Sequence, residues 1–142
     1  MAADYHLVGI LDRAGNGYSS RAGAAAYCVA DESIEAFRRF HSALYTNELQ
    51  PRENSGVYPD NARLIELARQ AGAAGGVADC INSGRYVEMV QGLAAATNIN
   101  ATPTVRINGE DYNPTTPQAL VDKVKEIVGD VPGLQAVAPA AQ

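Results

Sequence analysis

The sequence predicts an α/β domain in which a strand, four helices, a β-hairpin and a final helix follow one another along the chain. Three observations lead to this prediction. An apolar run of strand length lies between Asp4 and Leu11. In the middle of the chain, apolar residues recur at the spacing of amphipathic helices. Farther on, an alternating stretch of β-branched residues ends at the turn Asn108-Gly109. With 142 residues, the chain has the length of one domain and can bury a sizeable core.

The composition is that of a folded protein with few electrostatic partners. Hydrophobic residues make up 46% of the chain and charged residues 19%, which argues against disorder. The net charge is −5, so we expect no nucleic-acid partner and no attraction to an anionic membrane. No stretch is apolar for long enough to span a membrane, and the first residues lack the features of a signal peptide. The chain is therefore expected to be either cytosolic or a mature or trimmed piece of an exported protein.

The first half of the chain predicts a buried strand and two helices. The continuous apolar run of residues 4–11 is typical of a strand that is covered on both faces. After a loop over 12–17, Ser19 or Ser20 can cap an alanine-rich helix over 21–30. Ser33 then caps a second helix with an amphipathic stripe.

The second half predicts two more helices and a short helical turn. Pro59-Asp60 opens the third helix and Gly72 ends it. Residues 77–83 form a short turn or helix, and the fourth helix starts at Gly84-Arg85-Tyr86.

The C-terminal part predicts a hairpin, a helix and a tail. The step Thr102-Pro103 leads into a strand over 104–107, and a returning edge strand covers 110–113. Pro117 suits the first turn of the last helix, because its missing N–H is not needed there. The buried face of this helix is predicted to consist of Leu120, Val121, Val124, Ile127 and Val128. Residues 130–142 are rich in proline and alanine and are predicted to be a disordered tail.

The two cysteines, Cys28 and Cys80, leave three interpretations open from their spacing alone. They can be free core thiols, a structural disulfide, or half of a metal site. The metal interpretation is weak because the only histidines, His6 and His41, lie near neither cysteine in the sequence. His41 fits better as a residue packed beside the helical stripe than as a base or ligand. We therefore predict neither a metal nor a cofactor.

Several segments, taken in order, resemble the DsbA-like family of thiol:disulfide oxidoreductases, which have a thioredoxin fold with an inserted helical domain. The likeness covers about Tyr5 to Gly129. It rests on Tyr18-Ser19-Ser20-Arg21-Ala22, Ala26-Tyr27-Cys28-Val29-Ala30, Phe40-His41-Ser42-Ala43-Leu44-Tyr45, Leu64-Ile65-Glu66-Leu67-Ala68, Cys80-Ile81 with Gly84-Arg85-Tyr86, and Ala101-Thr102-Pro103-Thr104-Val105 with Asn108-Gly109. The closest likeness is to actinobacterial members.

The resemblance implies roles for four residues. Cys28 and Cys80 fall at the positions of a structural disulfide that ties the helical domain together. Thr102 and Pro103 fall at the loop that contacts an extended substrate polypeptide, with a cis peptide bond before Pro103; a trans bond at an ordinary strand entry is the alternative. Residues 4–17 and 98–129 would form a partial thioredoxin-like subdomain, and 18–97 the inserted helical subdomain.

One departure from the family pattern matters for activity. Family members carry Cys-x-x-Cys on a strand–helix unit that precedes the segment matching residues 4–11, and this sequence has no such pair. The expected fold is therefore an incomplete thioredoxin-like fold, with no catalytic residue in this chain. Unpaired sheet edges would favour self-association or strand exchange.

The expected function is that of a piece of an exported DsbA-like oxidoreductase, acting on cysteine-containing polypeptides in the bacterial cell envelope but redox-inactive alone. Any membrane attachment would need an anchor absent from this chain. One alternative is a redox-inactive peptide-binding, sensor or dimerisation domain of DsbG-like type, such as the ectodomain of a membrane kinase. Another is a cytosolic relative resembling glutathione-transferase-like isomerases, which predicts free thiols at Cys28 and Cys80.

Overall fold

The computed structural model describes residues 1–12, 17–52 and 55–130. The fold is rich in helix with a small two-stranded sheet, and the chain divides into two compact units. The helical unit comprises Tyr5–Asn100, and the C-terminal unit comprises residues 1–4 and 101–142. Residues 5–12, which the sequence grouped with 98–129, belong to the helical unit instead. Of the predicted tail over 130–142, residues 131–142 lie outside the described residues.

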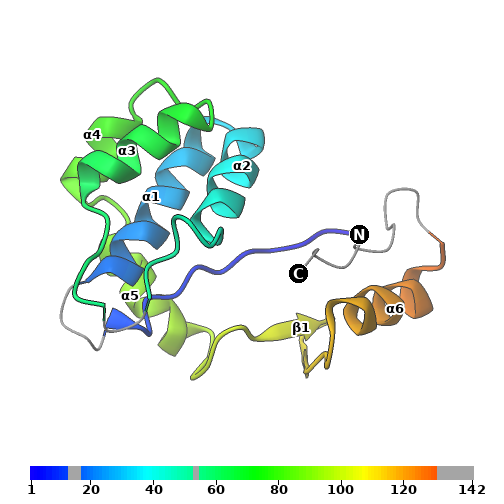
Figure 1. The fold of residues 1–142 in the computed structure, drawn as a ribbon. Coiled ribbons are helices and arrows are strands. Elements are labelled where there is room, and N and C mark those ends of the chain that lie inside the picture. The colour runs from blue at the N-terminus through cyan, green and yellow to red at the C-terminus, as the bar shows by residue number, and fades with distance from the viewer. Residues whose placement is uncertain (13–16, 53–54, 131–142) are drawn as a thin grey trace. The chain divides into compact units, whose positions relative to one another are not determined.

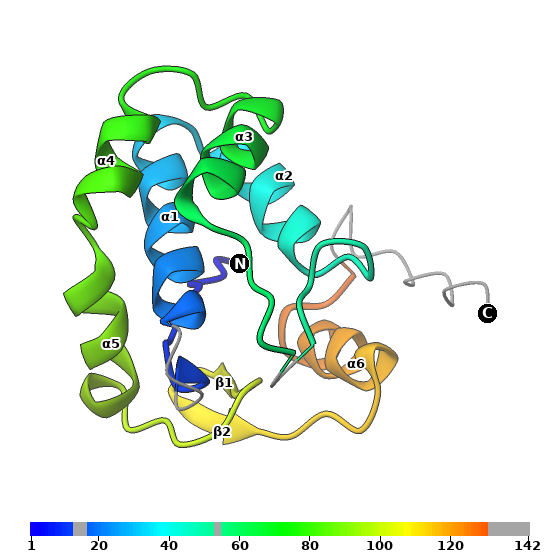
Figure 2. The same ribbon diagram turned by 60° about the vertical axis from the view of Figure 1, so that its left-hand side comes forward.

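The helical unit is built around its first helix, α1 (Tyr18–Glu32). The other helices are α2 (Ile34–Leu44), α3 (Asn61–Gln70), α4 (Val77–Ser83) and α5 (Val87–Ala96). All four pack directly against α1, which runs through the middle of the unit in Figures 1 and 2. The predicted short turn or helix over 77–83 is thus a fifth helix of the unit, α4.

Small side chains let the neighbouring helices approach α1 closely. Ala24, Ala25 and Ala26 are almost fully buried. A methyl group added at Gly23 would lie 2.9 Å from Cγ1 of Val90 on α5, closer than carbon atoms can pack. Larger core side chains fill the space between the other helices: Phe37, Phe40, Leu64, Leu67, Val77 and Ile81.

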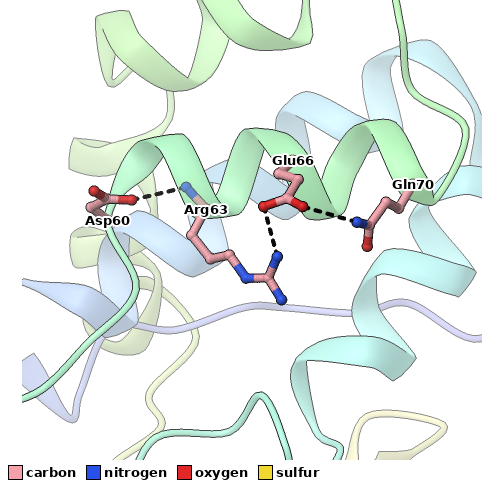
Figure 3. Close-up of polar contacts among 4 residues, drawn as sticks. All are labelled: Asp60, Arg63, Glu66 and Gln70. Carbon is pink, nitrogen blue, oxygen red and sulfur yellow. Dashed lines mark hydrogen bonds and ion pairs between the residues drawn. The ribbon is translucent and has the colours of Figure 1, made fainter.

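Local sequence signals explain where α2 and α3 begin. The Ser33 side chain accepts a hydrogen bond from the Ala36 N–H, as predicted. Asp60 does the same for the Arg63 N–H, at 2.9 Å. Figure 3 shows that the polar face of α3 continues from there through an Arg63–Glu66 ion pair to Gln70.

The start of α1 is organised differently from the prediction. Ser19 and Ser20 lie inside the helix, and the N-cap residue is Gly17, whose φ of 63° suits glycine. The missing side-chain cap comes from Asp12, eight residues before Ser20. Its carboxylate accepts from the Ser20 N–H at 3.2 Å and from the Ser20 hydroxyl. The predicted serine cap is wrong because a residue distant in sequence supplies the acceptor.

The predicted strand over 4–11 is absent. Figure 1 shows an extended trace there, but no strand pairs with it, since the described sheet holds only two strands. Side chains and one backbone group of the helices satisfy part of its backbone. The Tyr27 hydroxyl accepts from the Leu7 N–H at 3.3 Å and donates to the Tyr5 carbonyl, and the Gly9 N–H donates to the Val90 carbonyl. An apolar run forms a strand only where a neighbouring strand supplies a hydrogen-bond ladder.

The C-terminal unit contains the predicted hairpin and helix. Strand β1 (Val105–Ile107) pairs antiparallel with β2 (Glu110–Tyr112), with Ile107 opposite Glu110. Asn108 and Gly109 both have positive φ, as a tight two-residue turn requires. Helix α6 (Pro117–Val128) follows and is capped by the Thr116 side chain.

The predicted burial of one face of α6 is wrong. None of its residues is buried, and the exposed fractions of Ile127 and Val128 are 45% and 44%. The helix has the predicted amphipathic pattern, and the Tyr112 side chain of β2 reaches it, since the Tyr112 hydroxyl donates to the Ala119 carbonyl at 3.2 Å. An apolar stripe predicts which face of a helix can be buried, but not whether another element packs against that face.

Candidate functional site

The two cysteines form a disulfide bond between α1 and α4. The Cys28 and Cys80 sulfur atoms are 1.98 Å apart and the Cα atoms 5.8 Å apart. Cys28 is only 2% exposed and belongs to the hydrophobic core. Of the three interpretations left open by the spacing, the structure contains the disulfide. It also leaves no free thiol in the chain.

No metal site accompanies the cysteines. The residues that the structure describes contain no group of three or more histidine, cysteine, aspartate or glutamate side chains that could hold a metal ion. Within the described ranges, no helix is both long and apolar enough to cross a membrane.

The Thr102–Pro103 step forms the exposed lead-in to β1. The peptide bond between the two residues is cis, and both residues are exposed. The Thr104 hydroxyl donates to the Ala101 carbonyl at 2.7 Å, which closes the loop on itself. The Pro103 ring, which cannot donate a backbone hydrogen bond, is left at the surface.

An open cleft of about 210 Å³ lies beside this loop within the C-terminal unit, and both hairpin strands border it. The Asp111 carboxylate accepts from Nε of Arg106 at 2.5 Å, so this acidic group already has a partner. The lining residues are Pro103, Thr104, Val105, Asp111, Tyr112 and Asn113. The lining combines small side chains with the Tyr112 side chain and contains no cysteine.

The structure does not join the predicted site residues into one constellation. Thr102 and Pro103 belong to the C-terminal unit, whereas Cys28 and Cys80 belong to the helical unit. The family resemblance implies different roles for these pairs, a contact loop and a structural bond.

An aromatic cluster on α2 surrounds His41. Its ring lies 5.4 Å from that of Phe37, 5.0 Å from Tyr45 and 5.2 Å from Tyr5. Burial lowers the pKa of His41 below its usual value, because the surrounding rings disfavour the charged imidazolium. The predicted packing role of His41 agrees with this geometry. The spacing of Phe37, His41 and Tyr45, four residues apart on one helix, is a signal that could have identified the cluster.

A second polar contact ties α1 to the segment before α5. The Tyr86 hydroxyl donates to Oδ2 of Asp31 at 2.5 Å, and Arg85 lies 3.9 Å from the same oxygen. The hydrogen bond to Asp31 raises the pKa of Tyr86, since the phenol must lose the donated proton to ionise. This surface contact joins α1 to the N-cap residue of α5, next to the disulfide link between α1 and α4.

Comparison with known proteins identifies relatives with the same organisation. The family model described as Thioredoxin matches residues 7–126. The reduced form of the disulfide bond oxidoreductase DsbG from Mycobacterium tuberculosis is 68% identical, with a TM-score of 0.88 over 93% of this chain. Oxidised DsbA from the same organism is 67% identical, with a TM-score of 0.87. The serine/threonine-protein kinase PknE of M. tuberculosis is 37% identical over 105 residues, or 72% of this chain.

The relatives are longer than this chain. The matched region makes up 64% of the DsbG chain and 68% of the DsbA chain. It makes up 18% of the kinase.

Proposed function

The chain belongs to the thioredoxin family, in the DsbA-like group of thiol:disulfide oxidoreductases, and from this premise we propose that it is the substrate-holding part of such an enzyme. The sequence identity of 68% to a solved disulfide oxidoreductase is the observation that carries the proposal. In this role the chain contacts cysteine-containing polypeptides in the cell envelope and is redox-inactive by itself. It needs no cofactor for this role.

The redox-inactive part of the proposal follows from the chemistry of thiol–disulfide exchange. Exchange begins when a thiolate attacks a disulfide sulfur, and the displaced sulfur leaves as a second thiolate. Both cysteines of this chain are consumed in the bond between Cys28 and Cys80. Cys28 is only 2% exposed and Cys80 is partly buried, so an external thiolate has limited access to the bond.

Substrate contact is assigned to the exposed loop at Thr102 and Pro103. An extended polypeptide can add to a sheet edge through main-chain hydrogen bonds, while a neighbouring cleft accepts a side chain. The loop leads directly into β1, and the cleft of about 210 Å³ borders it. These features support a peptide-contact role for the two residues without giving either a catalytic one.

The extracytoplasmic setting is supported by the disulfide. Structural disulfides persist in oxidising compartments and are rare in the bacterial cytosol. A cytosolic isomerase-like relative would instead keep Cys28 and Cys80 reduced.

The test is a pair of activity assays on the chain, with M. tuberculosis DsbA as the positive control. We expect no acceleration of insulin reduction by dithiothreitol and no acceleration of the oxidative folding of reduced ribonuclease A. Catalysis above the uncatalysed rate that vanishes in the Cys28→Ser/Cys80→Ser variant would overturn the proposal. For peptide contact, we expect an S-methylated cysteine peptide to perturb the backbone amide signals of Thr102, Thr104 and Val105 in an NMR titration. Perturbation confined to other residues would reject the assigned loop.

The likeness to the kinase favours a second function, that of a redox-inactive binding or sensor domain. PknE is 37% identical over 105 residues, which make up 18% of that protein. The sequence encoded next to residues 1–142 in the genome distinguishes the two functions. A Cys-x-x-Cys motif there favours the oxidoreductase, and a kinase domain with a membrane anchor favours the sensor.

A further inference from the structure

Two links join the same pair of segments in the helical unit, namely α1 and the turn that leads from α4 to α5. The first link is the disulfide between Cys28 and Cys80. The second is the hydrogen bond that the Tyr86 hydroxyl donates to Oδ2 of Asp31 at 2.5 Å. All four residues belong to the helical unit. The covalent link and the polar link therefore act on the same two segments.

On the α1 side, the hydrogen-bond acceptor is tied rigidly to its cysteine. Asp31 follows Cys28 by three residues within the same helix. Residues at this spacing are neighbours on one side of a helix, one turn apart. A contact that fixes the position of Asp31 therefore also fixes the position of Cys28.

On the other side, a compact turn connects the hydrogen-bond donor to its cysteine. Gly84 has a φ of 65° and ends α4, as glycine often does at the end of a helix. The Cys80 carbonyl accepts from the Arg85 N–H at 3.4 Å and from the Ser83 hydroxyl at 3.0 Å. Tyr86 comes next and is the N-cap residue of α5. These contacts couple the position of Tyr86 to that of Cys80.

Neighbouring side chains hold the Tyr86 ring against α1. The centroid of this ring lies 5.9 Å from that of Tyr27, the residue before Cys28. The Arg85 guanidinium lies 5.5 Å from the Tyr86 ring centroid, and its Nη1 lies 3.9 Å from Oδ2 of Asp31. A hydrogen bond to a carboxylate is charge-assisted and stronger than one between neutral groups. The polar link is thus supported on both sides of the ring.

The polar link does not require the disulfide, so it can act when the cysteines are reduced. The two cysteines are 52 residues apart, and a flexible loop of that length gives its ends a low effective concentration. A contact that holds the two ends near each other raises this concentration. We propose that the Tyr86–Asp31 hydrogen bond positions the reduced Cys28 and Cys80 for bond formation, so that the disulfide forms rapidly and resists reduction.

Disulfide formation with glutathione disulfide as the oxidant has two steps, and the polar link acts on the second. In the first step, the thiolate of one cysteine attacks a sulfur of glutathione disulfide, and one glutathione thiolate leaves. In the second, the thiolate of the other cysteine attacks the protein sulfur of the mixed disulfide, and the second glutathione leaves. The two cysteines are oxidised, and glutathione disulfide is reduced to two thiols. Only the second step requires the two cysteines to be close together.

Redox equilibration with glutathione tests the proposal with a matched pair of variants. Tyr86→Phe removes the donor hydroxyl and keeps the ring beside Tyr27. Arg39→Met removes a polar contact elsewhere in the unit, in which Nε donates to the Ala71 carbonyl at 2.7 Å and joins α2 to α3. The fraction of chains with the disulfide is measured by alkylation and mass spectrometry at a series of ratios of reduced to oxidised glutathione.

We expect the equilibrium constant for disulfide formation to fall about threefold in Tyr86→Phe, as the loss of one hydrogen bond predicts, and to stay unchanged in Arg39→Met. An unchanged constant in Tyr86→Phe would overturn the proposal, because the packing of α4 on α1 would then position the cysteines without the hydroxyl. Equal losses in the two variants would also overturn it, because the general stability of the unit would then set the equilibrium.

The kinetics of oxidation supply a second measurement. After the reduced chain is mixed with glutathione disulfide, we expect more mixed disulfide with glutathione in Tyr86→Phe than in the unaltered chain, because the second step is slower. Asp31→Asn keeps an oxygen that accepts from the Tyr86 hydroxyl but loses the charge, so its level should lie between the two. Equal levels of mixed disulfide in all three proteins would reject the positioning role.

Discussion

Arg38 and Arg39 are neighbours on α2, but only Arg39 reaches another helix. Its Nε donates to the carbonyl of Ala71, the C-cap residue of α3, at 2.7 Å. A cation at this end also compensates the partial negative charge of the helix C-terminus. Arg38 is exposed and has no polar partner among the described residues. Although the two arginines look alike in sequence, their contributions to stability should differ.

We predict that Arg39→Met lowers the free energy of unfolding by about 1 kcal/mol, because a charge-assisted hydrogen bond at a helix end is lost. Arg38→Met should change it by less than about 0.5 kcal/mol, as is usual for surface substitutions. Urea unfolding followed by circular dichroism measures both. Equal losses for the two variants would show that the Ala71 contact contributes nothing specific.

His41 gives the helical unit a pH dependence with a defined sign. Burial lowers its pKa in the folded state, so the unfolded chain binds the proton more readily. The neutral ring's contribution to stability is therefore complete above the unfolded pKa of about 6.5, and is lost as pH falls through the lower folded pKa.

We predict that the urea midpoint of the unaltered chain falls between about pH 7 and pH 5, and that His41→Phe falls less steeply because it cannot titrate. Phenylalanine keeps a ring among Tyr5, Phe37 and Tyr45, so the packing at neutral pH is retained. The measurement is the difference between the two midpoint curves across this range. Parallel curves would assign the acid sensitivity to other groups.

At the scale of helices, the contact between α1 and α5 depends on one missing methyl group. A Cβ atom at Gly23 would meet Val90 at 2.9 Å, whereas one at Gly92, inside α5, would meet nothing within 4 Å. Both glycines lie inside helices, where alanine is intrinsically favoured by up to about 1 kcal/mol.

The two substitutions to alanine should therefore have opposite signs. Gly92→Ala is expected to stabilise the unit by up to about 1 kcal/mol. Gly23→Ala is expected to destabilise it by about 1 to 2 kcal/mol, because overpacking exceeds the gain in propensity. Thermal or urea unfolding of the pair measures both. Stabilisation by Gly23→Ala would show that α5 moves away from α1 at little cost.

The disulfide links α1 to α4 over a sequence separation of 52 residues. In the chain-entropy model, closing such a loop stabilises the folded state by about 4 kcal/mol. We predict a loss of about this size for Cys28→Ser/Cys80→Ser, and the same loss for the unaltered chain after reduction. The double variant should then be indifferent to dithiothreitol in urea unfolding. A chain whose stability is unchanged by reduction would contradict the prediction.

For the whole molecule, local sequence signals were sufficient to predict helix caps and turns wherever the hydrogen-bonded partner lies close in the sequence. Ser33, Asp60 and the Asn108-Gly109 turn act on residues within three positions, and each appears where the pattern predicts it. The disulfide could be assigned only through the family resemblance, on which the proposed contact loop also rests.

The errors arose where the partner is distant. The cap of α1 comes from Asp12 across a loop, and residues 4–11 lack the neighbouring strand that their composition suits. The stripe on α6 was identified correctly as apolar, but the sequence of a helix does not state what covers it. Hydrophobic periodicity identifies the apolar face of a helix, but tertiary packing determines whether that face is buried.

The same contrast predicts unequal dynamics in the two units. Every side chain in the described core lies between Ser20 and Val90, and the disulfide closes the chain within that range. Residues 105–128 form hydrogen bonds in a short hairpin and one helix without a buried side chain. Local opening is cheap where few apolar contacts oppose it.

In hydrogen exchange measured by mass spectrometry at low micromolar concentration, we expect slow exchange in α1 and α3 and fast exchange in β1, β2 and α6. Cys28→Ser/Cys80→Ser should speed exchange in the helical unit and leave that of α6 unchanged. Uniformly slow exchange in both units would contradict this prediction.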